Sequence, residues 1–155
     1  LTAVVVGAGP APYTGLRVGL VTAATLGFGL NIPVWGVSSL DALAESAPAD
    51  AADVVVVTDA KRKEVYTARY RRVAGEWERI SGPEVVKPAA LAQRESLVIG
   101  TDRYPELVAE VARVDAAALG RLALRRAQAG LAQPTTPLYL RRPDATPPPA
   151  PKPLQ

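Results

Sequence analysis

The sequence predicts an α/β protein that combines a β-α-β unit with a separate antiparallel meander. Three observations support this fold class: a strand-helix-strand pattern at the start, a polar linker, and strand-like runs in direct succession after it. Residues 1–6 form a continuous apolar strand, residues 14–30 a helix with Thr14 as its N-cap, and residues 33–37 a short second strand. Such a unit makes the two strands parallel, with a right-handed crossover.

The second part of the chain follows residues 47–53, a small polar linker that contains a proline. Residues 54–58 are expected to form a buried strand. Apolar and polar residues alternate over residues 64–73, which is typical of a strand with one solvent-exposed face. Gly75 precedes a return strand over residues 77–80. Strands that follow one another through short turns predict an antiparallel meander.

The remaining expected elements are shorter or weaker. The helices are one over residues 40–47 capped by Ser39, a short one over 87–93 with Pro88 in its first turn, and one from Asp115 to Ala129 that Gly130 stops. Residues 104–111 are weakly helical, and strands are expected over 96–99 and, at a sheet edge, over 137–142. A proline-rich tail begins at Pro143.

The helix over residues 14–30 has an unusual composition. Gly15, Gly19, Ala23 and Gly27 lie four residues apart and therefore share one face. Each helical glycine costs roughly 1 kcal/mol relative to alanine, so the pattern predicts the close approach of another backbone to this face. The other positions are nearly all apolar, which predicts a helix that is buried on all sides or contacts another subunit. Its apolar run is shorter than the roughly 20 residues that span a bilayer.

Composition narrows the possible chemistry. The chain has 155 residues, 48% of them hydrophobic, which suits one domain or two small lobes with a real core. The absence of cysteine and histidine excludes disulfides, thiolate metal sites, cysteine nucleophiles and the commonest general base. A formal charge of +3 permits nucleic-acid contact without indicating it. No secretory signal precedes the first strand, so a cytoplasmic protein is expected, and the lack of methionine suggests an N-terminally shortened chain.

Three places could carry chemistry, and each has a structural alternative. The glycine-rich loop over residues 7–15 opens a helix, where free N–H groups attract phosphate. Its spacing fits neither GxxxxGK[ST] nor GxGxxG, which favours a structural turn. Asp59 follows a buried strand, so it either meets a metal or polar substrate at the sheet edge or belongs to a charged hairpin turn. A set of arginines forms either a phosphate-contacting patch or a solubilising surface: Arg121, Arg125, Arg126, Arg141 and Arg142.

Three segments resemble the TsaB (YeaZ) family. GPAPYTGLRVGLVTAATLGFGLNIPVWGVSSLDALAE, residues 9–45, is similar to its signature: GPGSFTGLRIG, an alanine- and glycine-rich helix, a proline, a short strand and SSLEALA. TDAKRKEVYTARY, residues 58–70, resembles the family's DARRGEVYAA segment, and PLYLRRPDA, residues 137–145, resembles a C-terminal segment common in its actinobacterial members. The long first motif is specific, whereas the other two would be weak alone.

The resemblance implies an actin-like/Hsp70-like (ASKHA) fold of two lobes with mixed sheets. Residues 1–48 would be the remainder of the N-terminal lobe, starting at its fourth strand. Residues 49–142 would be the C-terminal lobe, and residues 143–155 a proline-rich disordered tail. The implied function is that of a non-catalytic subunit in the complex that transfers threonylcarbamoyl to N6 of adenosine 37 in tRNAs reading ANN codons.

The implied partners are the catalytic TsaD paralogue in a heterodimer, a second copy in a homodimer, a TsaE-type ATPase in the larger complex, and tRNA only indirectly. The resemblance implies no catalytic residue, cofactor, metal or membrane. The residues expected at the partner interface are Thr14, Gly15, Leu16, Gly19, Leu20, Ala23 and Gly27. The possible ligand or loop contacts are Gly9, Pro10, Arg17, Asp59, Arg62 and Glu64.

The chain departs from the family pattern at three positions. Ala11 and Pro12 replace Gly and Ser, and because proline lacks an N–H donor and fixes φ, this loop has one donor fewer for a ligand than the family pattern. Lys63 replaces a usually small residue. Descriptions of relatives as metalloproteases do not transfer, because the paired histidines of the metal-binding paralogue are absent. The alternative function is a free-standing nucleotide-binding enzyme of the sugar-kinase/actin type, using the residues 7–15 loop and Asp59.

Overall fold

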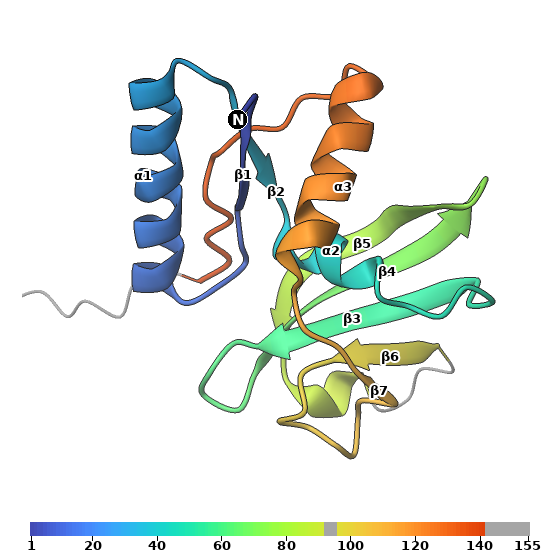
Figure 1. The fold of residues 1–155 in the computed structure, drawn as a ribbon. Helices are drawn as coiled ribbons and strands as arrows, with labels where there is room; N and C mark the ends of the chain where they lie inside the picture. The colour runs from blue at the N-terminus through green and yellow to red at the C-terminus, as the bar shows by residue number, and fades with distance from the viewer. Residues whose placement is uncertain (92–95, 142–155) are drawn as a thin grey trace, which may run out of the picture.

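The computed structural model describes residues 1–91 and 96–141, which form a mixed α/β structure with two separate sheets (Figure 1). Strands β1 (Val4–Gly7) and β2 (Val34–Val37) make a parallel pair. The second sheet has five strands in the order β5-β4-β3-β6-β7. The expected α/β class with a mixed sheet is confirmed.

The first sheet is the predicted β-α-β unit. Val4 pairs with Val34 and Gly7 with Val37, and helix α1 (Tyr13–Leu30) connects the two strands. The predicted Thr14 cap is wrong. The helix begins one residue earlier, and Pro12 occupies the cap position without any side-chain cap bond, because its fixed φ of −55° already suits the entry to a helix.

The second sheet contains the predicted meander. Strands β3 (Asp53–Asp59), β4 (Val65–Val73) and β5 (Glu76–Val86) are antiparallel neighbours. On the other edge β6 (Leu97–Gly100) runs parallel to β3, and the short β7 (Glu110–Val111) runs parallel to β6. The valine run of β3 is buried because this strand lies in the middle of the sheet.

Two core clusters cover the two faces of the second sheet. Helix α2 (Ser39–Ala44) places Leu40 and Leu43 on one face, against Val54 and Val56. The opposite face is a smaller cluster made of Val55, Val57, Val65, Leu91, Val98 and Val108. The cap of α2 differs from the prediction: Ser38 is the N-cap, its side chain makes no cap bond, and the helix ends at Ala44.

Helix α3 (Ala116–Gln128) returns to the first sheet, so contacts cross the boundary expected at residues 48–49. Leu122 and Ala123 pack with Val37 in a third buried cluster. The predicted cap of this helix is confirmed, since the Asp115 carboxylate accepts hydrogen bonds from the backbone N–H groups of Ala117 and Ala118. The proposed division into residues 1–48 and 49–142 stays a prediction.

A buried ionic group ties α2, α3 and the second sheet together. Asp41, 5% exposed, accepts a hydrogen bond from the Tyr70 hydroxyl at 2.7 Å and from the Arg126 guanidinium at 2.8 Å. Arg79 lies 3.6 Å from the same carboxylate. Burial, followed by the charge and hydrogen bond of Asp41, raises the pKa of Tyr70, so this phenol stays protonated and donates.

Three predicted elements differ from the structure. Residues 104–111 form turns and the end strand β7 rather than a helix. Residues 137–141 form no strand: the Tyr139 N–H donates to the Pro137 carbonyl in a tight turn, and the Leu138 N–H donates to the carbonyl of Ala8. The predicted helix over 87–93 is a 3-10 turn at Pro88–Ala90. Residues 92–93, position 142 and the predicted tail lie outside the described residues.

Candidate functional site

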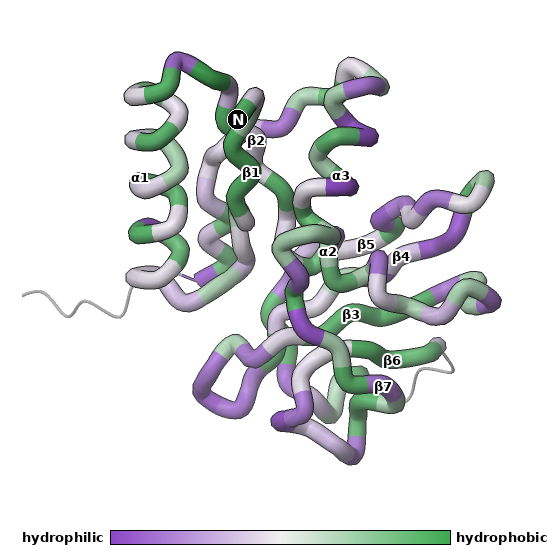
Figure 2. The backbone as a smooth tube through the Cα atoms, in the orientation of Figure 1, coloured by the Kyte–Doolittle hydropathy of each residue, from purple (hydrophilic) through white to green (hydrophobic). Residues whose placement is uncertain are grey.

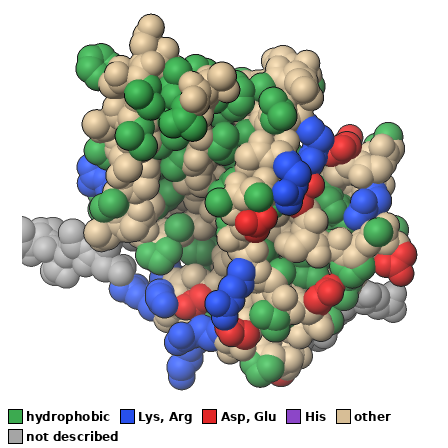
Figure 3. All heavy atoms as spheres, in the orientation of Figure 1, with side chains coloured by type: hydrophobic (Ala, Val, Ile, Leu, Met, Phe, Trp, Pro, Cys, Tyr) green, Lys and Arg blue, Asp and Glu red, His purple; other side chains and the backbone are tan. Residues whose placement is uncertain are grey.

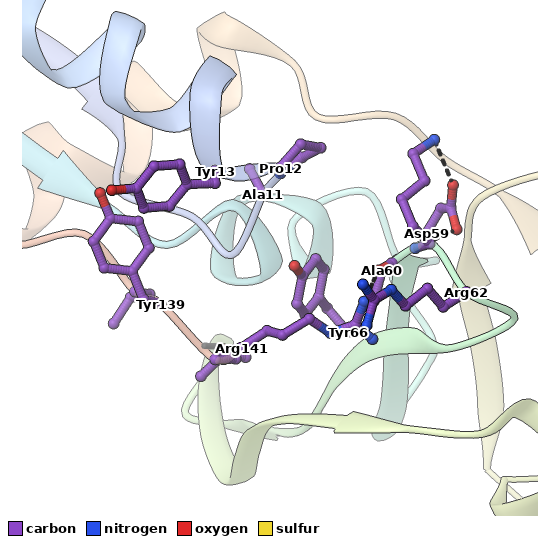
Figure 4. Close-up of a pocket in the computed structure, with 12 residues that line it drawn as sticks. Ala11, Pro12, Tyr13, Asp59, Ala60, Arg62, Tyr66, Tyr139 and Arg141 are labelled. Carbon is purple, nitrogen blue, oxygen red and sulfur yellow. Dashed lines mark hydrogen bonds and ion pairs between the residues drawn. The ribbon is translucent and has the colours of Figure 1, made fainter. Parts of the chain in front are cut away.

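The three segments that carry the family resemblance meet at one cleft. The loop before α1, the turn after β3 and the segment near residue 140 enclose a cavity of about 300 Å³ (Figure 4). Its lining residues are Ala11, Pro12, Tyr13, Asp59, Ala60, Lys61, Arg62, Tyr66, Leu138, Tyr139, Leu140 and Arg141. Segments that are distant in sequence therefore form a single site.

The turn after β3 has an unusual backbone. Lys61, Arg62 and Lys63 have φ values of 63°, 54° and 59°, so three successive side-chain-bearing residues lie in the left-handed region. This conformation costs roughly 1–2 kcal/mol per residue for L-amino acids. It gives a physical reason for the small residue that usually stands at position 63 in the family, since glycine adopts such φ values freely. The turn places Lys61 and Arg62 among the residues that line the cleft.

Asp59 fixes the start of this turn. Its carboxylate accepts hydrogen bonds from the backbone N–H and the Nζ of Lys61, both at 2.9 Å, and Arg103 lies 3.7 Å away. Burial raises the pKa of Asp59, but the hydrogen bonds from Lys61 and the charges of Arg103 and Lys61 outweigh it, so that the pKa is lowered overall. Asp59 is therefore an ionised anchor for the turn.

Tyr66 forms part of the inner wall of the cleft. The residue is only 7% exposed. Figure 4 shows its hydroxyl pointing toward the segment that contains Ala11 and Pro12. Burial, and then the negative charge of Asp59, raise the pKa of Tyr66, so the phenol stays protonated and can donate.

Arg141 joins the C-terminal segment to the turn. Its guanidinium forms an ion pair with Glu64 and donates to the carbonyl of Ala60 at 3.1 Å. Glu64 therefore affects the cleft only by holding Arg141 in place, because Glu64 is not among the residues that line the cavity. The contact positions the neighbouring Tyr139 beside the N-terminus of α1.

Two tyrosines form an aromatic wall at the other side of the cleft. The rings of Tyr13 and Tyr139 lie 5.1 Å apart between centroids, tilted by 33°. Arg17 donates to the Tyr13 hydroxyl at 2.7 Å and lies over its ring. Arg17 therefore supports the wall from outside the lining.

Of the predicted ligand contacts, Asp59 and Arg62 line the cavity directly. Gly9 and Pro10 are buried behind it, where the Gly9 carbonyl accepts a hydrogen bond from the Ser39 N–H. The prediction did not select Tyr66 and Tyr139 as site residues. Both occur in the segments that resemble the family, but only the tertiary structure brings them to one cleft.

The arginines for which the sequence offered a phosphate-contacting patch as one alternative do not gather into one patch among the described residues. Arg125 pairs with Glu45 at 2.6 Å and with Glu76 at 3.1 Å, and Arg126 pairs with the buried Asp41. Burial lowers the pKa of Arg125, but the hydrogen bond and charge of Glu45 and then of Glu76 raise it overall. Arg121 pairs with Asp115 on the surface and Arg141 belongs to the cleft; Arg142 lies outside the described residues. These ion pairs hold Arg125 and Arg126 within the fold, so they belong neither to a phosphate-contacting patch nor to a freely solvated surface.

Helix α1 has two unlike faces, which corrects the expectation that it is buried on all sides. Leu16, Ala23 and Gly27 are buried against this chain's own strands. At Gly27 an added Cβ would overlap the Val34 side chain, and it would lie 3.1 Å from the Ile32 carbonyl oxygen. The close approach predicted from the small residues exists at Gly27, within this chain, whereas an added Cβ would meet nothing within 4 Å at Gly15 and only Val6, at 4.0 Å, at Gly19. In this structure the buried Leu16, Ala23 and Gly27 are not available to a partner.

The outer face of α1 is exposed and apolar. Successive helical residues are turned by about 100°, so Thr14, Val18, Val21, Thr25 and Phe28 form one stripe opposite Ala23. Val18, Val21 and Phe28 are 61%, 64% and 90% exposed. Figure 2 shows the hydrophobic colouring along α1, and Figure 3 shows hydrophobic side chains gathered over this part of the molecule.

The other residues expected at the interface are at least partly accessible. Thr14 and Gly15 are exposed, whereas Gly19 and Leu20 are half-buried. Among the described residues there is no group of acidic, histidine or cysteine side chains that could hold a metal ion. No helix in the described ranges is both long and apolar enough to cross a membrane.

Comparisons with known proteins give the family. The family model described as "TsaD: tRNA N6-adenosine threonylcarbamoyltransferase" matches residues 1–106. An uncharacterised protein of Mycobacterium leprae is 43% identical over 161 residues, which cover 95% of this chain and 40% of that protein. The tRNA threonylcarbamoyladenosine biosynthesis protein TsaB of Escherichia coli is 33% identical over 118 residues, covering 69% of this chain and 51% of its own length.

A solved structure agrees with these matches. YeaZ from Pseudomonas aeruginosa superposes with a TM-score of 0.75 and 27% identity over 90% of this chain and 74% of that one. The chain thus spans about half the length of the Escherichia coli relative and three quarters of the Pseudomonas structure. The matches, together with the mixed sheet, support the ASKHA-like α/β fold. The chain belongs to the family of the TsaD model and, within it, to the TsaB (YeaZ) group of threonylcarbamoyladenosine biosynthesis proteins.

Proposed function

We propose that this protein is a non-catalytic, cytoplasmic subunit of the tRNA threonylcarbamoyladenosine machinery that binds and stabilises the catalytic TsaD-type paralogue. The observation that carries the proposal is the outer stripe of α1, defined as Thr14, Val18, Val21, Thr25 and Phe28. Isolated apolar side chains are common on protein surfaces, but several exposed apolar side chains on one helix face are typical of a protein interface. Three of its members are more than 60% exposed.

The two faces of α1 have different roles: the inner face packs on this chain's own strands, and the outer stripe is free to bind a partner. The small residues of the inner face let the helix lie close to β1 and β2, which fixes its position without occupying the outer stripe. A rigid helix that presents Val18, Val21 and Phe28 loses little conformational freedom on binding. The stripe suits a helix of a partner subunit or, in a homodimer, the same helix of a second copy.

The side-chain chemistry agrees with a role in binding. The sequence contains no histidine and no cysteine, and the carboxylate of Asp59 in the cleft is held by Lys61. The alternative of a free-standing nucleotide-dependent enzyme would need a general base or a metal-bound triphosphate, and nothing in the described cleft favours it.

The test is reconstitution with the catalytic paralogue. The wild-type chain should co-elute with the paralogue in size-exclusion chromatography and raise its threonylcarbamoyl transfer, while showing no activity alone. Val21→Glu should weaken the complex by a hundredfold or more, because a buried unpaired charge is strongly unfavourable at an interface. Leu124→Glu is the matched control, since Leu124 is a 52% exposed leucine on α3.

Activity of the chain alone, or equal complex formation by wild type and Val21→Glu, would contradict the proposal. A homodimer that Val21→Glu dissociates, with no binding to the paralogue, would assign the stripe to self-association and reject the catalytic partner.

A further inference from the structure

One edge of the second sheet carries a charged surface that the outer stripe of α1 does not explain. Strands β3, β6 and β7 run parallel to one another, so the chain leaves all three at the same edge (Figure 1). The segments that follow these strands contain five basic residues, which we call the basic rim: Lys61, Arg62, Lys63, Arg103 and Arg113. Lys63, Arg103 and Arg113 do not line the cleft. The rim is therefore a separate feature of the surface.

The contacts within the basic rim make it one continuous surface. Lys61 Nζ and Arg103 Nε lie 2.9 Å and 3.7 Å from the same carboxylate oxygen of Asp59. Asp102 is the neighbour of Arg103 in the sequence, and its carboxylate lies 3.6 Å from the Arg113 guanidinium. Asp59, Asp102 and Arg113 also line one hollow of about 280 Å³. Figure 3 shows basic side chains gathered over the lower part of the molecule, where this edge of the sheet lies.

The basic rim has an excess of accessible positive charge. The side chains of Lys61, Arg103 and Arg113 are 64%, 60% and 86% exposed. The five basic residues face two carboxylates, Asp59 and Asp102, which leaves three positive charges, and the formal charge of the whole chain is +3. Exposed single contacts such as those of Arg103 and Arg113 contribute little stability. Both guanidinium groups can therefore turn from a carboxylate to a phosphate at little cost.

We infer that the basic rim binds the phosphate backbone of tRNA directly, an inference that rests on the proposed function, since the proposed complex acts on tRNA. Exposed lysine and arginine side chains spread along an edge are the groups that contact nucleic-acid phosphates, and such contacts orient the RNA without reading its sequence. An anionic membrane fits less well, because binding in the membrane interface uses an amphipathic helix or a lipid anchor, whereas the rim residues lie in turns and irregular segments.

The turn after β3 holds three of the rim residues in a defined arrangement. Two backbone hydrogen bonds close it, from the Ala60 N–H to the Glu64 carbonyl and from the Glu64 N–H to the Lys61 carbonyl. Residues 61–63 are all exposed. A closed turn loses less conformational freedom on binding than an open loop does. Lys63, which replaces a usually small residue of the family pattern, adds one charge to this surface.

The test is a fluorescence anisotropy titration of a labelled, unmodified tRNA transcript that reads ANN codons. It is carried out with the wild-type chain, alone and in its complex with the catalytic paralogue, between about 50 and 200 mM salt. A variant with Lys63→Ala, Arg103→Ala and Arg113→Ala together should bind about tenfold more weakly or worse. The slope of log affinity against log salt should become shallower by about 1 for each phosphate contact removed.

Arg71→Ala is the matched control for the single variant Arg103→Ala. Both arginines are more than half exposed, and each is paired with a carboxylate at one end of β3: Arg71 with Asp53 at its first residue, and Arg103 with Asp59 at its last. Arg71→Ala removes the same charge at the opposite edge of the sheet and should bind tRNA like the wild type. Arg103→Ala should weaken binding and make the salt slope shallower by about 1. Unchanged melting temperatures would show that each variant is folded.

Equal tRNA affinity and salt slope of the triple variant and the wild type, or no binding by either, both alone and in the complex, would overturn the inference. Binding of phosphatidylserine vesicles that the triple variant loses, without binding of tRNA, would also overturn it and assign the rim to a membrane surface. None of these variants changes the outer stripe, so co-elution with the catalytic paralogue should be unchanged. Retained co-elution without an effect on tRNA binding would therefore reject this inference alone, whereas failure of the wild type to co-elute would reject the proposed function.

Discussion

Two glycines in the last turns of α1 should respond oppositely to the same substitution. At Gly27 a methyl group would overlap the Val34 side chain and press on the Ile32 carbonyl, whereas at Gly29 no heavy atom lies within 4 Å. Overpacking costs roughly 1–3 kcal/mol, and replacing a helical glycine by alanine returns about 0.5–1 kcal/mol. Gly27→Ala should therefore lower the free energy of unfolding by about 1–2 kcal/mol, while Gly29→Ala should raise it by about 0.5–1 kcal/mol.

The assay is urea denaturation of the wild-type chain and both variants under one set of conditions. The slopes should agree, so that the midpoints report stability directly. The two glycines lie two residues apart on one helix, so helix propensity nearly cancels between them and the difference isolates packing against β2. If Gly27→Ala stabilised the chain as much as Gly29→Ala does, the inner face of α1 would not be packed as described, and the assignment of an inner and an outer face would be refuted.

Three further predictions concern side chains that hold the fold. Asp41→Asn should lower the free energy of unfolding by about 3 kcal/mol in urea denaturation, because the half-buried Arg126 loses the charge of its buried carboxylate partner, whereas Asp102→Asn, at a surface ion pair, should change it by less than about 0.5 kcal/mol. Asp115→Ala should cost about 1 kcal/mol and reduce the helical circular dichroism signal, because the cap of α3 is lost; an unchanged midpoint would contradict this role. The lowered pKa of Asp59 means that the folded state binds fewer protons than the unfolded state, so stability should fall as pH drops below the ordinary value of 3.8, and Asp59→Asn should make this fall shallower in melting curves recorded from pH 6 to pH 2.

Local sequence signals were sufficient to predict the elements that are determined by residues close together in the chain. The apolar runs of β1 and β3, the β-α-β spacing and the Asp115 cap each follow from residues that are close in sequence. Glycine at the meander turn is also explained locally, because Ala74 and Gly75 both have positive φ. These elements were therefore predictable.

Elements that depend on distant partners were not predictable in the same way. Residues 104–111 have weak helical character, but Glu110 and Val111 at their end pair with β6. The backbone N–H of Leu138 donates its hydrogen bond to the carbonyl of Ala8, near the opposite end of the chain. Which face of α1 is covered depends on where β1 and β2 lie, and an apolar helix sequence alone does not reveal it. The cleft was likewise not predictable from local sequence, since Tyr66 and Tyr139 become neighbours of α1 only in the folded chain.

The most direct test of the central claim uses the absence of cysteine in this sequence. Val21→Cys and Leu124→Cys each introduce a single exposed thiol, one on the outer stripe of α1 and one on α3. The rate of modification by a thiol reagent is measured for each variant alone and after addition of the catalytic paralogue. We expect the paralogue to slow the reaction at position 21 at least tenfold and to leave position 124 unchanged. Equal reactivity at position 21 with and without the partner, under conditions where the complex forms, would show that α1 does not make the interface.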